Sequence, residues 1–263
     1  LSHVPEVAVP GDLPPPASEP SPPAMIASND ELYLTGLHLE QYRHATRSPE
    51  PYWREAVRRD PDDSRANTAL GAWHLRRGDF GVAEQHFRKA IGRLTRLNPN
   101  PYDGEPLYLL GVTLRYRGRD REAYDALAKA CWNQAWAGAG FHALAEIDAG
   151  GGRWTQALEH LGRTLRLNAD DLKARDLRAA VLRHTGMPEE AHREAEATLA
   201  LDPLDLWATL ERRWAAQALG RPAQAVRLGD LQAHLDVALD LASAGLWDDA
   251  IDAAEAGLGA DST

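Results

Sequence analysis

The stretch ALGAWHLRRGDFGVAEQHFRKA, residues 69–90, decides the fold of this chain. It predicts two short helices that fold back on each other, with a turn at Gly78. Gly71 and Ala83 provide the small side chains that let two helix backbones cross closely, and Leu70 and Phe87 fill the space on either side. One hairpin of this kind cannot bury its own apolar face, so it requires stacked neighbours.

The same pattern returns along the chain. The Leu-Gly pair of residues 70–71 recurs at residues 110–111, and later units follow at intervals of 34 residues. Turn glycines mark four of the units: Gly78, Gly118, Gly152 and Gly186. The sequence therefore predicts an all-α protein built of antiparallel helix pairs. We place these pairs at about residues 29–61, 64–97, 104–136, 138–168 and 172–202.

The spacing of Leu-Gly followed by Ala-x3-Phe resembles that of the tetratricopeptide repeat, or TPR. Four units between Ser64 and Pro203 match it. The resemblance implies a right-handed α-solenoid, the TPR superhelix, in which the first helix of each pair lines a concave groove. In TPR proteins this groove is presented to peptides or to other proteins.

Both ends of the chain depart from the repeat. Residues 1–28 are rich in proline and predict an extended linker, with a ligand for a proline-binding module as the alternative. After residue 203 the period fails, because Gly245 follows Gly220 by only 25 residues. We expect a degenerate pair at 206–228, with a short second helix at 223–228, and a final pair at 231–258. Since the chain starts at Leu1 and ends without a polar capping helix, we also expect further sequence on either side.

Composition excludes several classes of partner. A net charge of −10 and a pI near 5.5 argue against nucleic acid and against an anionic membrane surface. No apolar run approaches the roughly 20 residues that span a bilayer. The single cysteine, Cys131, fits a reducing compartment. The sequence therefore predicts a cytoplasmic protein.

A narrower resemblance is carried by NDELYLTGLHLEQYRHATRSPEPYWREA, residues 29–56, and by the inserted NPNPYDGEPLYLLG, residues 98–111. Both segments are similar to a bacterial family whose members carry a galactose-mutarotase-like β-sandwich of unknown function, then a proline-rich segment, then helical repeats. The resemblance covers residues 29–258 and implies that this chain is the helical part. It supplies no catalytic residues.

The groove residues follow from the repeat positions. We expect these side chains to face the concave surface: Arg65, Thr68, Tyr108, Arg115, His142, Glu146, Asp176, Arg183 and Trp207. A solvated inner surface without a specific ligand is the alternative. Thr68, Ala72, Ala139 and Ala143 stand where a carboxylate clamp would need lysine, asparagine and basic residues, which excludes recognition of a chaperone's C-terminal carboxylate.

Catalytic and metal-binding motifs are absent from the sequence. His142 and Glu146 lie four residues apart on one helical face, but no third ligand stands at helical spacing, so a hydrogen-bonded pair is the better interpretation. We expect Cys131 to fill space in the core. We expect Trp132 and Trp136 to pack between repeats rather than to bind a sugar. Asp103 is expected to cap the helix that follows it.

These observations predict a non-catalytic scaffold, without cofactor or metal, that binds a protein or peptide on its concave face. The alternative is an accessory or oligomerisation module of a carbohydrate-active protein, with the upstream β domain of the same gene product as its partner. Homo-oligomerisation is compatible with both.

Overall fold

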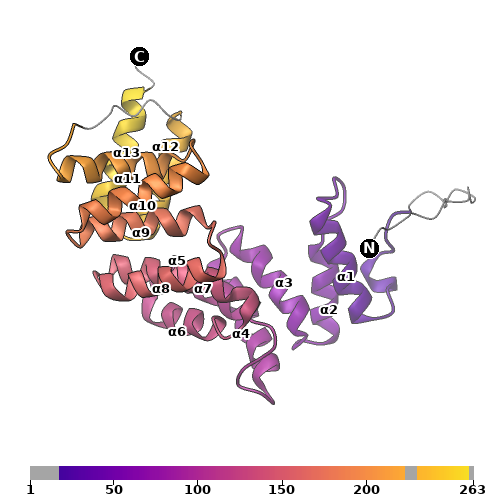
Figure 1. Ribbon diagram of the computed structural model, residues 1–263. Coiled ribbons are helices and arrows are strands. Elements are labelled where there is room, and N and C mark those ends of the chain that lie inside the picture. Colours follow the sequence, from indigo (N-terminus) through magenta and orange to yellow (C-terminus); the bar gives the residue numbers. More distant parts are fainter. Residues whose placement is uncertain (1–17, 223–229, 261–263) are drawn as a thin grey trace, which may run out of the picture. The chain divides into compact units, whose positions relative to one another are not determined.

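A computed structural model describes residues 18–222 and 230–260 of the chain. These residues form thirteen α-helices, one short 3-10 helix and no β-strand (Figure 1). The helices are η1 (Pro23–Met25), α1 (Asn29–Gln41), α2 (Glu50–Arg59), α3 (Ser64–Leu75), α4 (Phe80–Thr95), α5 (Glu105–Tyr116), α6 (Asp120–Ala130), α7 (Gln134–Gly150), α8 (Trp154–Leu167), α9 (Leu172–His184), α10 (Pro188–Leu201), α11 (Leu206–Ala218), α12 (Leu231–Ser243) and α13 (Trp247–Ala260). The predicted all-α fold is confirmed. The short second helix predicted at 223–228 lies outside the described residues.

The chain divides into two compact units, residues 1–61 and 62–263. In the first unit, α1 and α2 cross where Gly36 of α1 faces the fully buried Trp53 of α2. The Trp53 indole donates to the carbonyl of Tyr33 at 3.3 Å. Arg59 holds the segment before α1 in place by donating to the carbonyl of Ile26 at 2.8 Å. The first pair is therefore a tight hairpin whose small residue, Gly36, is matched to a tryptophan.

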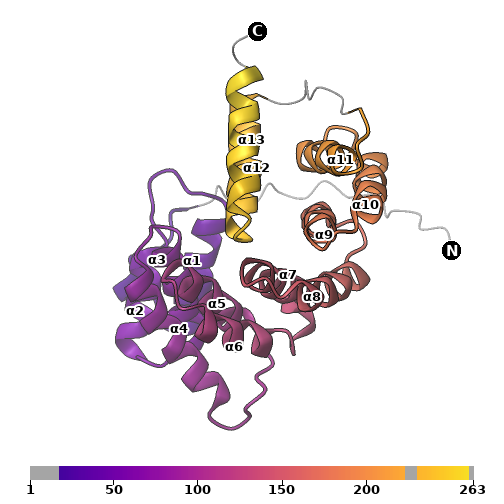
Figure 2. The same cartoon turned by 90° about the vertical axis from the view of Figure 1, so that its left-hand side faces the viewer.

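The second unit is a stack of helix pairs. α3 packs on α4, α5 on α6, α7 on α8, and α9 on α10, and each pair contacts the next. α5, α7, α9 and α11 lie along the inner side of this stack, and α6, α8 and α10 lie outside them (Figure 2). The first helices of successive repeats therefore share one inner surface.

In the second unit the first helix of each pair is followed by a glycine in the left-handed region, whereas the α1–α2 turn has Arg43 at a φ of 47°. Gly78 has φ of 78°, and Gly118, Gly152, Gly186, Gly220 and Gly245 have φ between 65° and 75°. At the first turn the amide of Asp79 donates to the carbonyl of His74 and that of Gly78 to the carbonyl of Leu75, which is the Schellman arrangement. Glycine adopts this backbone without strain, so the predicted turn positions have a local physical cause.

The helix crossings occur at the predicted small residues. A Cβ on Gly71 would lie 2.5 Å from the buried ring of Phe87, and one on Gly111 would lie 2.5 Å from Leu127. Ala83 is fully buried at the same crossing as Gly71. Close contact between backbone and a large apolar side chain is thus repeated in successive pairs.

The boundary between the third and fourth pairs differs from the sequence prediction. α7 begins at Gln134, before the predicted residue 138, because the side chain of Asn133 accepts from the amide of Ala135 and starts the helix there. The inserted segment after α4 is a loop held by Asn133, whose side chain donates to the carbonyl of Tyr102 at 2.5 Å. Asp103 accepts from the amide of Glu105, the first residue of α5, but Gly104 and not Asp103 stands at the N-cap position.

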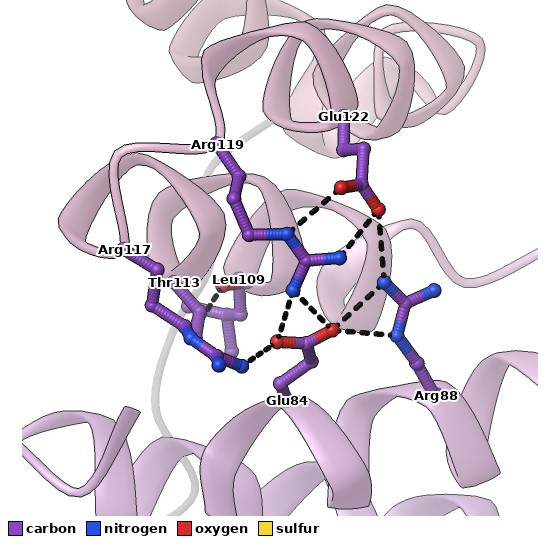
Figure 3. Close-up of polar contacts among 7 residues, drawn as sticks. All are labelled: Glu84, Arg88, Leu109, Thr113, Arg117, Arg119 and Glu122. Carbon is purple, nitrogen blue, oxygen red and sulfur yellow. Dashed lines mark hydrogen bonds and ion pairs between the residues drawn. The ribbon is translucent and has the colours of Figure 1, made fainter. Parts of the chain in front are cut away.

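A cluster of charges joins the second pair to the third (Figure 3). The carboxylate of Glu84, in α4, accepts from Arg88 and from Arg119 at 2.8 Å each and also from Arg117. Burial alone would raise the pKa of Glu84, but the hydrogen bonds from Arg88 and Arg119 hold it below its usual value. Arg119 also pairs with Glu122 at the start of α6. Glu84 therefore fixes the turn after α5 against α4.

The crossing at Gly71 can be tested against a glycine with open space around it. Gly71→Ala places a methyl group against the buried Phe87 ring, and we expect it to lower the free energy of unfolding by about 1–3 kcal/mol. Gly92→Ala, in α4, meets nothing within 4 Å and is expected to stabilise the chain by about 0.5 kcal/mol or more through helix propensity. Urea unfolding of both variants measures the difference. Equal effects would contradict the assigned crossing.

The charge cluster offers a matched pair of isosteric substitutions. The Glu84 side chain is 9% exposed and that of Glu122 is 49% exposed. Glu84→Gln removes the charge that three arginines share, so we expect a loss of about 1–3 kcal/mol. Glu122→Gln should cost less than about 1 kcal/mol because its pairs are open to solvent. Thermal melts at neutral pH check this, and a larger effect at Glu122 would refute it.

Candidate functional site

An open cleft of about 1300 Å³ lies on the inner side of the second unit. One wall is formed by α5 and α7, and the facing wall by α12 and α13. Aromatic side chains line it from both walls: Tyr108, Tyr116 and Trp247. Tyr116 is 66% exposed and Trp247 is 65% exposed. The cleft therefore presents large exposed aromatic side chains, although one face of the Tyr116 ring stacks on Phe80 with 4.9 Å between the centroids.

The polar centre of the cleft is Arg115 of α5. Its guanidinium donates to the carboxylate of Glu146, in α7, and at 2.7 Å to the backbone carbonyl of Ser243, at the end of α12. His142 Nε2 lies 3.9 Å from the second oxygen of Glu146. All three side chains are mostly buried. Arg115 thus links α5 to α7 and α12, and it leaves the aromatic side chains on either side of it accessible.

Tyr108 serves mainly as support. Its ring stacks on Trp136 with 5.0 Å between the centroids. Burial, and then the charge of Glu146, raise the pKa of its hydroxyl, so Tyr108 is neutral at physiological pH and can donate one hydrogen bond. Trp132, by contrast, is 75% exposed and does not line the cleft.

A second polar cluster, which we call the clasp, holds α13 against α9. Arg183 donates at 2.8 Å to Glu211 of α11 and at 2.7 Å to Asp249 of α13. His184 Nε2 also lies 2.7 Å from Asp249, and its ring stacks on Trp154. Although burial would raise the pKa of Asp249, His184 and Arg183 hold it below its usual value. The clasp is a mostly buried ion network that links α9, α11 and α13.

Of the nine predicted groove residues, five meet at the cleft: Tyr108, Arg115, His142, Glu146 and Trp207. Arg183 is taken up by the clasp. Thr68 is buried, and its hydroxyl donates to the carbonyl of Ser64 at 2.7 Å. Arg65 is exposed in the first turn of α3. Asp176 is buried beneath α11.

The described residues offer little for metal binding or thiol chemistry. They contain no group of three or more histidine, cysteine or acidic side chains arranged to hold a metal ion. Burial raises the pKa of Cys131 to about 11, so this thiol is protonated at physiological pH and is a poor nucleophile. Within the same ranges, no helix has the length and apolarity needed to cross a membrane.

Solved structures of other proteins have the same architecture. PilF of Pseudomonas aeruginosa superposes with a TM-score of 0.62 at 20% identity, over 81% of this chain and 90% of PilF. A tetratricopeptide-repeat protein from Parabacteroides merdae gives 0.61 at 13% identity, over 88% of this chain and 98% of its own. The fold is that of the tetratricopeptide repeat.

A third TPR structure, YrrB, has a TM-score of 0.56 at 15% identity, over 69% of this chain and 90% of YrrB. It is described as a TPR protein with an unusual peptide-binding site. No family model matches the chain. At these identities the likeness shows the TPR fold.

The sequence prediction missed the wall of the cleft that α12 and α13 provide. Lys173 of α9 pairs with Asp240 of α12 at 2.9 Å, and Leu239 and Trp247 line the cleft from the same hairpin. The signal that points to this arrangement is the 25-residue interval between Gly220 and Gly245. A pair that arrives out of register with a TPR array does not stack as the next repeat.

Asp176 generates a pH-dependent prediction. Burial, and then the charge of Asp205, the N-cap of α11, raise its pKa to about 9, so the Asp176 carboxyl is protonated at neutral pH. Because the folded chain holds this proton and the unfolded chain releases it near pH 4, stability should fall by up to about 1.4 kcal/mol per pH unit between about pH 4 and pH 9.

Asp176→Asn keeps a donor and cannot ionise. We therefore expect it to raise the melting temperature at pH 8 and to leave it nearly unchanged at pH 4, whereas the exposed control Asp252→Asn changes neither. Calorimetry over this pH range measures the effect. A variant that is less stable than wild type at pH 8 would show that Asp176 is ionised in the fold.

Proposed function

We propose that this chain is a non-catalytic scaffold that binds a protein segment in the cleft between α5 and the α12–α13 hairpin. The observation that carries the proposal is the pair of exposed aromatic rings, Tyr116 and Trp247, that line one cleft from opposite walls. Exposed aromatic groups beside an anchored arginine are typical of the centres of protein interfaces.

The shape and chemistry of the cleft support a polypeptide as the ligand. Its lining mixes aromatic, aliphatic and charged side chains in an open channel, whereas small-molecule sites are more enclosed. The inner helices bring residues from three or more repeats to one surface, so an extended or helical segment would contact several repeats at once. TPR proteins such as YrrB, described as having a peptide-binding site, have the same fold.

The partner can be captured from the cleft itself. A photoreactive amino acid at Tyr116 of the full chain should cross-link to one protein in the native cell, while the same group at Trp132, which is exposed outside the cleft, should not. Cross-links to an upstream β domain of the same gene product would support the accessory-module alternative. Equal labelling from both positions would contradict binding in the cleft.

Affinity then tests the aromatic pair. We expect Tyr116→Ala with Trp247→Ala to weaken binding of the captured partner by about 2 kcal/mol or more, about thirtyfold, because both rings belong to hot-spot types. Trp132→Ala is the matched control and should leave the affinity unchanged. Since both cleft rings are mostly exposed, the double variant should melt near the wild-type temperature. Titration calorimetry measures the affinity, and an unchanged value would exclude this surface.

A further inference from the structure

The C-terminal hairpin, α12 with α13, does not extend the TPR array. It lies on the inner side of the arc formed by α5, α7, α9 and α11 (Figure 2). α12 and α13 run across the axes of α9 and α11, which this view shows end-on (Figure 2). The hairpin is therefore a separate element placed where the groove of a TPR superhelix receives its ligand.

The surface beneath the hairpin, which we call the seat, is formed by α9 and α11. Its polar contacts are the clasp between Arg183, His184 and Asp249, with the ion pair of Lys173 and Asp240 at 2.9 Å. Its apolar side chains, among them Val181, Leu210 and Trp214, belong to one core cluster with hairpin residues. The hairpin contributes Val237, Leu241, Leu246, Ala250 and Ala253 to that cluster.

Charge complementarity accompanies this packing. Residues 231–260 contain no lysine or arginine, and their carboxylates are Asp236, Asp240, Asp248, Asp249, Asp252 and Glu255. The cations that meet the hairpin, Lys173, Arg183 and Arg115, all come from inner helices of the array. The hairpin is thus an acidic element that pairs with Lys173 and Arg183, and Arg183 is shared with Glu211 of α11.

The exposed surface of the hairpin is unlike that of a terminal repeat. Leu239 and Trp247 are exposed in the cleft, and Leu235 and Ile251 are exposed outside its lining, whereas the capping repeats of solenoids have a polar outer face. The hairpin therefore does not have the surface of a simple end cap.

We propose that the seat is a recognition site for acidic amphipathic helices and that α12–α13 occupies it as a tethered internal ligand. A partner with an acidic helical segment binds the seat by exchange with the hairpin. Tethering gives the internal ligand an effective concentration of the order of millimolar, so exchange needs either a strong partner or a weakened hairpin contact. The proposal concerns the covered seat, and because the hairpin also forms one wall of the open cleft, exchange at the seat removes that wall.

The probe for this exchange is a fluorescein-labelled peptide of residues 231–260, added to the full chain. Wild-type protein should bind it weakly because the internal hairpin competes. Leu241→Ala with Asp249→Asn weakens the hairpin and leaves the seat intact, so the full-chain variant should bind the probe at least about tenfold more tightly, as the accessible fraction of seats rises. Asp252→Asn, an exposed change of equal charge in α13, is the control and should bind as weakly as wild type.

Two further substitutions locate the binding. Adding Arg183→Gln, on the seat, should abolish the gain, and Tyr116→Ala, in the cleft, should leave it unchanged. A folded double variant that binds no more tightly than wild type would overturn the proposal, as would a gain that survives Arg183→Gln. Circular dichroism establishes that each variant is folded.

Hydrogen exchange of the wild-type chain keeps the proposal testable if the double variant does not fold. An exchangeable hairpin must open separately, so amides of α12 and α13 should exchange faster than those of α9 and by an opening of lower free energy. Exchange of all three helices only through global unfolding would show that the hairpin is a permanent part of the core and would refute the proposal.

Discussion

The close crossing of the two helices in each pair is the constraint on which the rest of the structure depends. Gly71 faces Phe87, and Gly111 faces Leu127. A Cβ atom on either glycine would lie 2.5 Å from the facing side chain, which is too close for an undisturbed contact. Because the two helices of each pair cross this closely, successive pairs stack with their first helices side by side. That stacking brings Tyr108 and Arg115 of one repeat and Glu146 of the next onto one inner surface, where the cleft forms.

The α12–α13 hairpin then divides that inner surface. Over α9 and α11 it buries the groove and engages Arg183 in the clasp. Beside α5 and α7 it leaves a cleft open and adds Trp247 to its rim. A single element thus defines both the surface that is available to a ligand and the surface that becomes available only when the hairpin leaves. The buried ion network at Asp249 fixes one docked position rather than a range of them.

Features with a local cause could be predicted from the sequence. The left-handed turns require glycine at Gly78 and its equivalents, and the crossings require Gly71 and Gly111, so the helix pairs and the cleft residues of α5 and α7 follow from the period. The contacts of Arg183 and the burial of Asp176 have causes that the repeat period does not contain. Arg183 meets Asp249 across 66 residues of sequence, and Asp176 is buried against the cap of the next pair. The galactose-mutarotase-like partner domain stays a prediction from the resemblance of residues 29–56 and 98–111.

The central claim is that the hairpin is seated on the inner surface of the array instead of stacked at its end. Zero-length carbodiimide cross-linking of the intact chain tests it directly, because it joins a lysine to a carboxylate only when the two are in contact. Lys173 and Asp240 form an ion pair of 2.9 Å and lie 67 residues apart in sequence. The account predicts an intramolecular Lys173–Asp240 cross-link in the monomer, identified by mass spectrometry. A monomer in which Lys173 cross-links to no carboxylate of residues 231–260 would contradict it.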